Sequence, residues 1–444
     1  VKIQTHLKSI QDKLDSAVHG HQEAKDAVIR VIGQWISNKD SQGMVLGLQG
    51  PPGNGKTTFA KEGVAKALDR PFAFLSLGGM TDSAYLIGHD FTYVGSKWGQ
   101  IVDCLIRTKC MNPVILFDEL DKVSMTEHGR EIIGILTHLT DSTQNQTFQD
   151  KYFSGINFDL SKALIIFTYN DPSKIDPILR DRMSVIKTKP LSLKDKLVIA
   201  QDYLMPNILK TLGFESDDIS IDSKEVEYLV TTYTIEAGVR RLKEFLFSIC
   251  RDINLNRLLD PSFPLPAKIT RDVIETILSK KPKVEPKTVG LNPLVGTVNG
   301  LFATSAGSGG LTIIQAFRSP SERRLGLELT GSQGDVMQES MKTAKTVAWN
   351  LLPKHLQERI YKETPFGLHI HVPETSTPKD GPSAGGAITV SLISQLTGVP
   401  IKQNVAMTGE VDLNGNITKI GGLIYKLQGA KRAGVKTVLI PKDN

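Results

Sequence analysis

The sequence predicts an α/β domain built on a parallel sheet, then a small all-helical subdomain and a C-terminal α+β domain. Apolar, strand-like runs alternate with helical patterns over residues 41–190. Helical periodicity alone covers residues 191–280, and strand-like runs return after residue 293. The chain has 444 residues, which is too long for one hydrophobic core, so roughly two to four domains are expected.

Residues 1–40 are helical in pattern. Apolar residues recur at spacings of three and four, at Leu7, Ile10 and Leu14 and again at Ala24, Ala27, Val28 and Val31. The tripeptide Val18-His19-Gly20 interrupts this pattern. We therefore expect a lead-in helix, a turn and a second helix that leads into the α/β domain.

The first chemical motif is Gly-Pro-Pro-Gly-Asn-Gly-Lys-Thr-Thr at residues 50–58. An apolar run precedes it and a helical pattern over residues 59–68 follows, which is the context of a phosphate-binding P-loop. In such a loop Lys56 would reach the β- and γ-phosphates, and the Thr57 hydroxyl would bind Mg²⁺. The motif therefore predicts a nucleoside triphosphate with Mg²⁺. The residues expected to bind it are Gly50, Pro51, Pro52, Gly53, Asn54, Gly55, Lys56, Thr57 and Thr58.

Two further buried strands carry polar residues at their ends. Residues 113–117 are apolar and are followed by Asp118 and Glu119, which is a Walker B arrangement. Asp118 would hold Mg²⁺, and Glu119 would orient or deprotonate the attacking water. The apolar run at residues 163–169 ends at Asn170.

A loop between the two Walker elements contains Tyr93 and Val94, with glycines at both ends of the segment 88–95. Two interpretations are open. Tyr93 is either a buried aromatic residue or an exposed one that grips a polypeptide.

Residues 191–280 are expected to form helices at 194–212, 223–233, 238–258 and 270–279, with Ser192 as the first N-cap. Residues 281–292 are charged and contain prolines, as in a linker. Beyond them, strands are expected at 296–303, 311–317, 325–329 and 367–372, and an amphipathic helix at 335–351.

A second chemical motif surrounds Ser383. Small residues flank this hydroxyl at the start of an apolar helix, where free N–H groups suit an oxyanion hole. A nucleophilic serine needs a base. His369 and His371 are candidates for a Ser-His-Asp arrangement, and Lys426 is the alternative if burial lowers its pKa. The residues alone leave this choice open.

The two histidines also admit other interpretations, because both point to one face of the same predicted strand. A metal pair is one, but no third ligand follows at a recognisable spacing. The alternative is that they are hydrogen-bonded structural residues.

Composition limits the function classes. Lys plus Arg total 53 and Asp plus Glu 47, a net charge of +6, which permits polyanion binding without demanding it. No run of 18 apolar residues is present, so no membrane span is expected. Three cysteines form no framework, which fits a reducing compartment.

Taken together, these motifs resemble those of Lon proteases of the A type. In the C-terminal part the matching segments are residues 378–385 (Pro-Lys-Asp-Gly-Pro-Ser-Ala-Gly), 407–410 (Met-Thr-Gly-Glu) and 421–426 (Gly-Gly-Leu-Ile-Tyr-Lys). In the AAA+ part they are the P-loop and residues 76–80, 117–122, 159–162 and 236–240. The resemblance covers almost the whole chain in order.

The resemblance implies an AAA+ P-loop domain (41–190) with a helical small domain (191–280) and a Lon-type proteolytic domain (293–444). It also implies site residues. Ser383 resembles the nucleophile, Lys426 the general base and Thr408 the residue that orients the lysine, with Asp380 and His371 as supporting neighbours. Asn170 resembles sensor 1 and Arg240 sensor 2. Arg182, with Arg180 beside it, resembles the arginine finger, and Tyr93 and Val94 resemble the pore loop.

The implied function is an ATP-dependent serine endopeptidase that acts on unfolded or damaged proteins as a homohexameric ring, in the cytoplasm or mitochondrial matrix. An AAA+ unfoldase or chaperone with an inactive or secondary peptidase site is the alternative, and DNA binding is a less favoured partner class. Asp90 and Phe91 stand where relatives usually carry two arginines, and residues 124–141, which include the expected second pore loop, also differ. We expect a core fragment that lacks the family's N-terminal domain and is truncated at its C-terminus.

Overall fold

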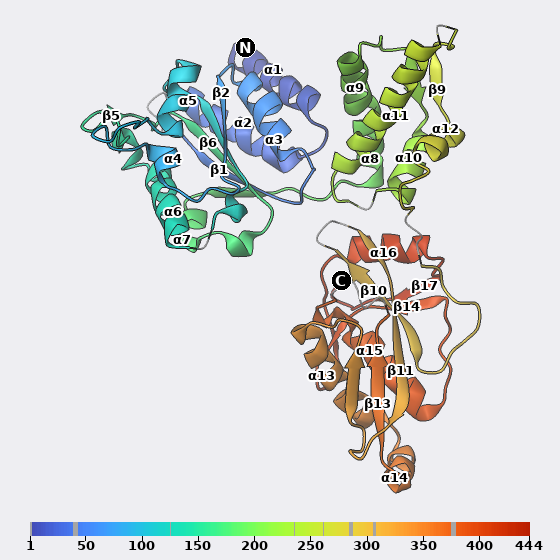
Figure 1. Ribbon diagram of the computed structural model, residues 1–444. Coiled ribbons are helices and arrows are strands. Elements are labelled where there is room, and N and C mark those ends of the chain that lie inside the picture. Colours follow the sequence, from blue (N-terminus) through green and yellow to red (C-terminus); the bar gives the residue numbers. More distant parts are fainter. Residues whose placement is uncertain are drawn as a thin grey trace. The chain divides into compact units, whose positions relative to one another are not determined.

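The computed structural model describes residues 2–38, 43–124, 126–234, 236–260, 262–283, 287–304, 308–373 and 379–444, without the side chains of Lys2 and His128. The chain forms two compact units, Val1–Lys281 and Pro282–Asn444 (Figure 1). The boundary between them falls inside the predicted linker, of which residues 284–286 lie outside the described part.

A five-stranded parallel sheet forms the centre of the first unit, in the strand order β2-β3-β6-β1-β7. The strand before the P-loop therefore lies next to β6, and β6 lies next to the Walker B strand. Because the strands are parallel, the polar residues that follow them gather at one edge of the sheet. The strands are β1 (Val45–Gln49), β2 (Phe72–Ser76), β3 (Val114–Asp118), β6 (Leu164–Tyr169) and β7 (Ser184–Lys187).

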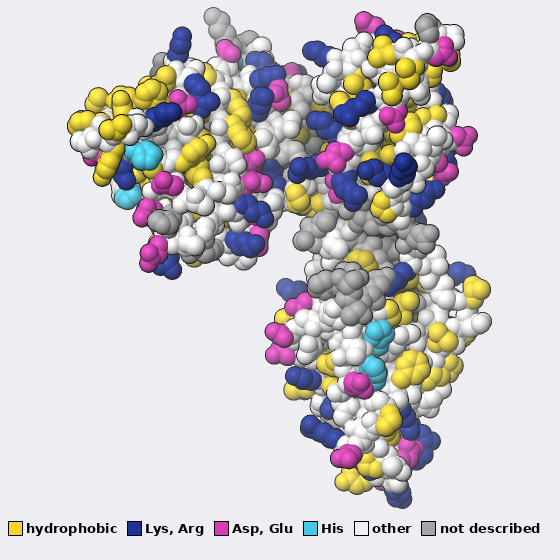
Figure 2. All heavy atoms as spheres, viewed as in Figure 1, with side chains coloured by type: hydrophobic (Ala, Val, Ile, Leu, Met, Phe, Trp, Pro, Cys, Tyr) yellow, Lys and Arg dark blue, Asp and Glu magenta, His cyan; other side chains and the backbone are white. Residues whose placement is uncertain are grey.

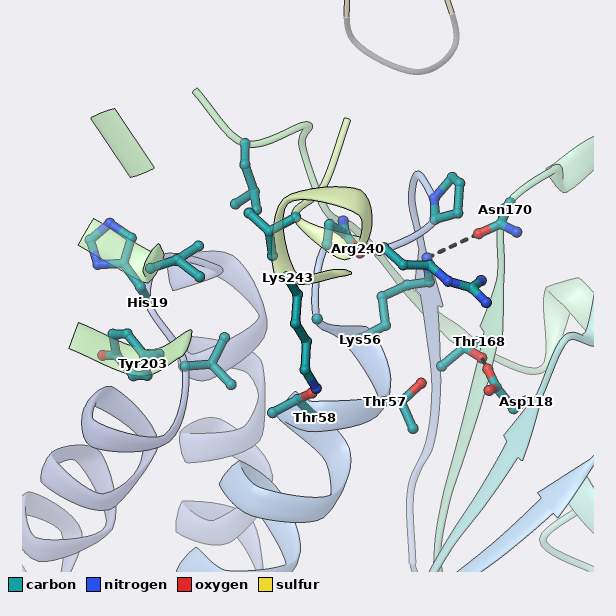
Figure 3. A pocket seen from close by; sticks show the side chains of 18 of the residues that line it. His19, Lys56, Thr57, Thr58, Asp118, Thr168, Asn170, Tyr203, Arg240 and Lys243 are labelled. Carbon is teal, nitrogen blue, oxygen red and sulfur yellow. Dashed lines mark hydrogen bonds between the residues drawn. The ribbon is translucent and has the colours of Figure 1, made fainter. Parts of the chain in front are cut away.

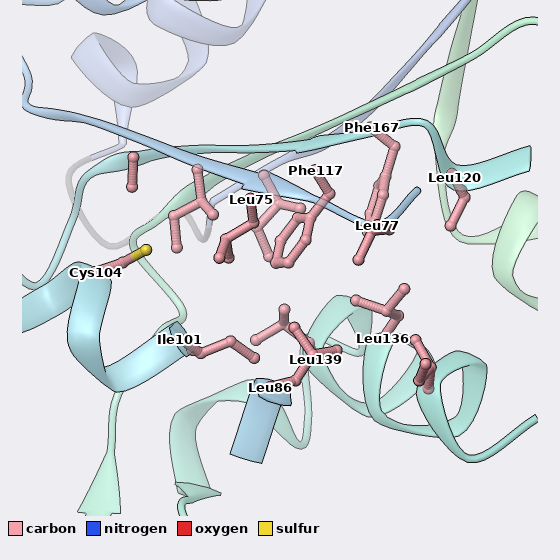
Figure 4. Close-up of a cluster of buried hydrophobic side chains, with 14 of the residues drawn as sticks. Leu75, Leu77, Leu86, Ile101, Cys104, Phe117, Leu120, Leu136, Leu139 and Phe167 are labelled. Carbon is pink, nitrogen blue, oxygen red and sulfur yellow. The ribbon is translucent and has the colours of Figure 1, made fainter. Parts of the chain in front are cut away.

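Alternating side chains of the central strands pack into two hydrophobic layers, one on each face of the sheet, as expected for strands buried on both faces. In β3, Ile115 and Phe117 pack with Phe167 of β6 against α5 and α6 (Figure 4). Val114 and Leu116 point to the other layer, which contains α1, α2 and the helix after the P-loop. The elements of these two layers are α1 (Lys2–Ala17), α2 (Gln22–Ser37), α3 (Lys56–Thr58), α4 (Ala84–Ile87), α5 (Gln100–Thr108), α6 (Glu127–Thr140) and α7 (Pro177–Asp181).

Two details of this region differ from the prediction. The helix expected at residues 59–68 begins at Lys56, and its segment Phe59–Ala65 is π-helical. In addition, a short antiparallel pair, β4 (Phe148–Gln149) and β5 (Asn157–Phe158), forms between α6 and β6. The break at residues 18–20 was predicted correctly, since α1 ends at Ala17 and α2 begins at Gln22.

The region expected to be all-helical contains a small parallel pair of strands, β8 (Ile219–Ile221) and β9 (Ala267–Ile269), so the all-α prediction was wrong in this detail. Ile219 and Ile221 are buried and the residue between them is exposed, a period of two that was too short to detect beside strong helical signals. The helices are α8 (Leu193–Val198), α9 (Met205–Leu212), α10 (Ser223–Thr232), α11 (Arg240–Leu259) and α12 (Arg271–Ile277), with a π-helical segment Ile199–Leu204 between α8 and α9.

The second unit contains a six-stranded mixed sheet in the order β12-β13-β11-β10-β14-β17. Helices α13 and α15 pack on it around one core, and α16 packs on β10 and β11 around a smaller one. The strands are β10 (Thr297–Ala303), β11 (Gly309–Pro320), β12 (Leu327–Thr330), β13 (Phe366–His371), β14 (Val405–Met407), β15 (Glu410–Val411), β16 (Ile417–Thr418) and β17 (Thr437–Leu439). The helices are α13 (Asp335–Leu351), α14 (Lys354–Lys362), α15 (Gly385–Thr397) and α16 (Leu423–Arg432).

Asn414 and Gly415 lie in the connection between β15 and β16, which pair with each other as a hairpin. Thr408 lies directly after β14. Within the described ranges, none of the helices has the length and apolar character needed to cross a membrane.

Candidate nucleotide and peptidase sites

A cavity of about 540 Å³ opens beside the P-loop in the first unit (Figure 3). Most residues predicted to bind nucleotide line it, although they come from four separate segments. These residues are Pro52, Gly53, Asn54, Gly55, Lys56, Thr57, Thr58, Asp118, Glu119, Asn170 and Arg240. The glycines Gly53 and Gly55 have positive φ, as a loop that turns its N–H groups toward a phosphate requires.

Lys56 points into this cavity and is bound to the loop itself. Its ammonium donates hydrogen bonds to the carbonyl oxygens of Gly50 (2.7 Å) and Pro51 (2.8 Å) and to Oδ1 of Asn170 (3.0 Å). Burial lowers the pKa of Lys56 from 10.5 to about 8, and the charges of Asp118 and Asp121 oppose this shift. Burial thus disfavours the charged form of Lys56, and the negative charge of a bound phosphate would stabilise that form.

The N-terminus of α11 rests directly on the P-loop. Val239 N–H donates to the Gly53 carbonyl at 3.0 Å, and a Cβ added to Gly53 would lie 3.1 Å from the Cβ of Arg240. Glycine at position 53 therefore permits the close approach that brings Arg240 into the cavity.

The Walker B residues have distinct surroundings. Asp118 accepts a hydrogen bond from the Thr168 hydroxyl of β6, which fixes one carboxylate oxygen. Glu119 adopts a left-handed backbone conformation (φ 61), which is uncommon for a residue other than glycine. Its carboxylate packs against Gly78, where a Cβ would lie 2.1 Å from Oε2. The strained backbone and the absent side chain at position 78 together determine where Glu119 points, as is typical of functional sites.

Several residues of the cavity were missed by the sequence reasoning. His19, Tyr203 and Lys243 line it together with apolar neighbours such as Val18 and Leu204. In the sequence, Val18 and His19 stood out only as part of the break between the first two helices. A further histidine, His21, bonds the Asn54 carbonyl through Nε2 at 2.7 Å, and burial is the main cause that lowers its pKa.

Arg182 does not line this cavity. Its Nη1 forms an ion pair with Asp141 at 2.7 Å and donates to the Thr137 carbonyl at 2.9 Å. Arg180 lies two residues earlier at the exposed end of α7. These bonds hold the Arg182 side chain away from the cavity of its own chain.

Tyr93 and Val94 lie on an exposed loop between α4 and α5, so the buried alternative for Tyr93 was wrong. Tyr93 is 69% exposed and Val94 fully exposed. The loop leads into Trp98, whose ring packs on Tyr152 and Phe153 at centroid distances of 5.8 and 6.1 Å. Figure 2 shows hydrophobic side chains gathered over this end of the unit, around β5.

The second pore loop was expected within residues 124–141. Residues 127–140 form helix α6, whereas Met125 and the His128 side chain lie outside the described part.

The second unit brings Ser383, Lys426 and Thr408 together from three separate segments. Lys426 Nζ lies 2.9 Å from Ser383 Oγ and 3.0 Å from Thr408 Oγ1. Lys426 is 3% exposed and Thr408 is fully buried. Burial lowers the pKa of Lys426, which favours the neutral amine. A neutral amine at hydrogen-bond distance from a hydroxyl can accept its proton.

Glycines allow α16 to carry Lys426 this deep into the unit. A Cβ on Gly309 of β11 would lie 2.2 Å from the Tyr425 carbonyl oxygen, and one on Gly429 would lie 2.3 Å from the backbone of Gly309. Larger residues at positions 309 or 429 would therefore push α16 away from the sheet and withdraw Lys426 from Ser383.

Ser383 lies in a short 3-10 turn, Pro382–Ala384, directly before α15. Its carbonyl accepts a hydrogen bond from Gly409 N–H at 2.8 Å, which joins the serine turn to the segment of Thr408. A cavity of about 700 Å³ adjoins the two side chains Ser383 and Lys426. Asp380 also lines the cavity, but its Oδ1 accepts from Met337 N–H at 2.9 Å at the start of α13. Pro378, quoted in the serine motif, lies outside the described residues.

His369 and His371 are elsewhere in this unit. Both bond the Thr330 hydroxyl of the neighbouring strand β12, at 2.8 and 2.7 Å. No histidine lines the cavity at Ser383 among the residues that the structure describes, so the geometry favours Lys426 as the base. The described residues also contain no group of three or more His, Cys, Asp or Glu that could hold a metal. Because both rings are hydrogen-bonded to Thr330, the geometry favours the structural interpretation of this pair.

Three family models match the chain in sequence. Residues 46–191 match the ATPase family associated with various cellular activities (AAA), and residues 210–262 match the Lon protease AAA+ ATPase lid domain. Residues 268–444 match the Lon protease (S16) C-terminal proteolytic domain. The two candidate sites thus lie in regions that match an ATPase family and a peptidase family, respectively.

Similar proteins include a "Lon protease homolog" of Acanthamoeba polyphaga mimivirus, 39% identical over 100% of this chain and 49% of the relative. The "Lon protease" of Clostridioides difficile is 37% identical over 98% of this chain and 54% of the relative. The "Lon protease homolog, mitochondrial" of Drosophila melanogaster is 36% identical over 99% and 43%, respectively. The chain spans about half the length of these curated relatives. The lid and proteolytic regions of the chain thus match Lon protease family models, and its whole length aligns with relatives named Lon protease.

Proposed function

We propose that this chain is the motor and peptidase core of an ATP-dependent protease that unfolds protein substrates and cleaves their peptide bonds. The observation that carries this proposal is the buried Lys426 amine, which lies between Ser383 and Thr408. We assign nucleotide-dependent work to residues 41–280 and peptide cleavage to residues 293–444.

In the peptidase reaction, neutral Lys426 accepts the proton of Ser383 Oγ as this oxygen attacks the scissile carbonyl carbon. The C–O bond forms, and the carbonyl π electrons move to the oxygen, whose negative charge backbone N–H groups beside Ser383 would stabilise. Collapse of this intermediate breaks the C–N bond, and protonated Lys426 returns its proton to the leaving amine. Water then cleaves the acyl-serine ester by the same proton route. Thr408 positions the amine for both transfers.

In the nucleotide cavity, Lys56 and the P-loop N–H groups would hold the phosphates of ATP, and Thr57 and Asp118 would hold Mg²⁺. The oxygen donors of Thr57 and Asp118 suit this hard cation, which would neutralise phosphate charge when bound. Glu119 orients or deprotonates the attacking water. Asn170 and Arg240, which line the same cavity, would respond to the terminal phosphate.

Arg182 supports an oligomeric state in which ATP sites form between subunits. We propose a homohexameric ring, in which Arg182 of one subunit stabilises charge on the ATP of the next. The exposed Tyr93 and Val94 would grip an unfolded polypeptide and convert the ATPase cycle into translocation. The free cysteines and the mitochondrial relative support a reducing compartment, the cytoplasm or the mitochondrial matrix.

A fluorogenic peptide and an unfolded protein, each incubated with and without ATP, test this proposal. We expect peptide cleavage and ATP-dependent degradation of the protein. Cleavage of neither substrate, with or without ATP, would instead support the AAA+ chaperone alternative.

A further inference from the structure

Lys243 is a charged residue of the nucleotide cavity that none of the motifs identifies. It lies on α11, three residues after Arg240, so both side chains leave the same face of the helix about 4.5 Å apart along its axis. Both line the cavity. In Figure 3 the Lys243 side chain extends into the cavity toward Thr58, whereas Arg240 extends toward the side where Asp118 and Asn170 lie.

The charge of Lys243 is available to a ligand. Within the described part of the chain Lys243 forms no ion pair, and the adjacent carboxylate of Glu244 lies 3.8 Å from Arg240 Nε. The Lys243 side chain is exposed, so no buried partner is lost when it turns toward a phosphate. A lysine in this position is a mobile point charge suited to phosphate binding.

The cavity fixes which phosphate this lysine can reach. Lys56 and Asn170 mark the end for the γ-phosphate, because the P-loop lysine contacts the β- and γ-phosphates. His19 and Tyr203 line the opposite part, which leaves that part for the sugar and base. Thr58, at the start of the helix after the loop, lies between the two ends (Figure 3). Lys243 therefore faces the phosphate nearest the ribose.

We propose that Lys243 binds the α-phosphate of the bound nucleotide, while Arg240, one turn earlier on the same helix, responds to the terminal phosphate. This inference rests on the proposed nucleotide site. Its consequence is that α11 is held to the nucleotide in both the ATP and the ADP state through Lys243. Only the Arg240 contact changes on hydrolysis.

The test measures the affinities of ATP and ADP for the full chain and for Lys243→Met, by calorimetry at low and high salt. We expect both affinities to fall by the same factor, about five- to tenfold at low salt and less at high salt. Lys243→Arg should retain most of the affinity, and Arg240→Met should weaken ATP more than ADP. Arg241→Met is the matched control, because Arg241 is an exposed neighbour on α11 outside the cavity and its substitution should leave both affinities unchanged.

The possible outcomes are distinct. A loss for ATP alone in Lys243→Met would overturn the assignment to the α-phosphate, and unchanged affinities would remove Lys243 from the site altogether. If the unmodified chain binds neither nucleotide, the proposed function fails and not merely this inference. Lys243 and Arg241 are both exposed, so we expect their substitutions to leave the unfolding temperature unchanged. Thermal unfolding of each variant checks that a loss of affinity is not due to misfolding.

Discussion

Lys426 Nζ lies 2.9 Å from Ser383 Oγ, although 43 positions separate the two residues in the sequence. Three features support this contact: burial of the amine, a second bond to Thr408, and glycines that let α16 approach the sheet. A protonated lysine in such surroundings is disfavoured, and a neutral one is a base. The contact therefore supports Lys426 as the base that removes the proton of Ser383.

Peptidase activity should rise with pH as Lys426 loses its proton. Because burial lowers the pKa of Lys426, the midpoint should lie below its ordinary value of 10.5. The measurement is the pH profile of kcat for a fluorogenic peptide. Lys426→Arg should be inactive across the profile, because arginine does not deprotonate in this range. A profile that is flat from pH 6 to pH 10 would contradict a lysine base.

The same shift affects stability. Between the folded and the unfolded pKa of Lys426 the unfolded state binds more protons, so the free energy of unfolding should rise with pH in that window and level off near 10.5. Lys426→Met should lose this pH-dependent increment. Denaturant unfolding of the two proteins at several pH values measures it, and parallel curves would show that Lys426 is not perturbed.

Thr408→Val should lower peptide cleavage by roughly thirtyfold, because it removes a hydrogen bond of about 2 kcal/mol that orients Lys426. Thr408→Ser keeps the hydroxyl and should retain most of the activity. The midpoint of the pH profile should also move in Thr408→Val, which a purely structural role would not cause. Equal losses in the valine and serine variants would indicate a packing defect.

ATP binding should weaken as the pH rises through about 8, the pKa of Lys56 in the free site. A bound phosphate raises that pKa, so binding takes up a proton, and affinity should fall by up to about tenfold per pH unit above this value. Calorimetry in two buffers of different ionisation enthalpy measures the proton uptake directly. Binding without proton uptake at pH 8.5 would show that Lys56 is already charged in the free protein.

Arg182→Ala and Glu119→Gln should each abolish ATP hydrolysis, the arginine variant by at least about a thousandfold. A mixture of the two variants should regain part of the activity, because one subunit supplies Glu119 and its neighbour supplies Arg182. ATPase rates of the separate and mixed proteins test this. If mixing restores nothing although the subunits assemble, Arg182 does not act between subunits.

The sequence predicted the parallel sheet and the helices well, because these follow from periodicity. The contiguous P-loop motif pointed to residues that line a cavity, and their role in nucleotide binding stays a prediction. It missed Lys243 and His19, which enter the nucleotide cavity from distant elements and belong to no local pattern. It also missed β8 and β9, whose few residues are too short for periodicity to reveal.

The base of the peptidase site could not be chosen from the residues alone. Histidine and lysine both satisfy the chemistry, and spacing along the chain does not say which of them is near Ser383. The choice depends on how α16 packs against β11, where two glycines permit close contact. Similarly, the exposure of Tyr93 depends on tertiary structure, since an aromatic residue beside glycines fits either a core or a surface loop.

Replacement of Ser383 by alanine tests the central claim most directly. Degradation of an unfolded protein and ATP hydrolysis should be measured on the same preparation, with the unmodified chain as control. The account predicts that degradation falls by at least about a thousandfold, whereas ATP hydrolysis in the other unit continues at the unmodified rate. Continued degradation by Ser383→Ala would contradict the account, because Ser383 would then not be the nucleophile.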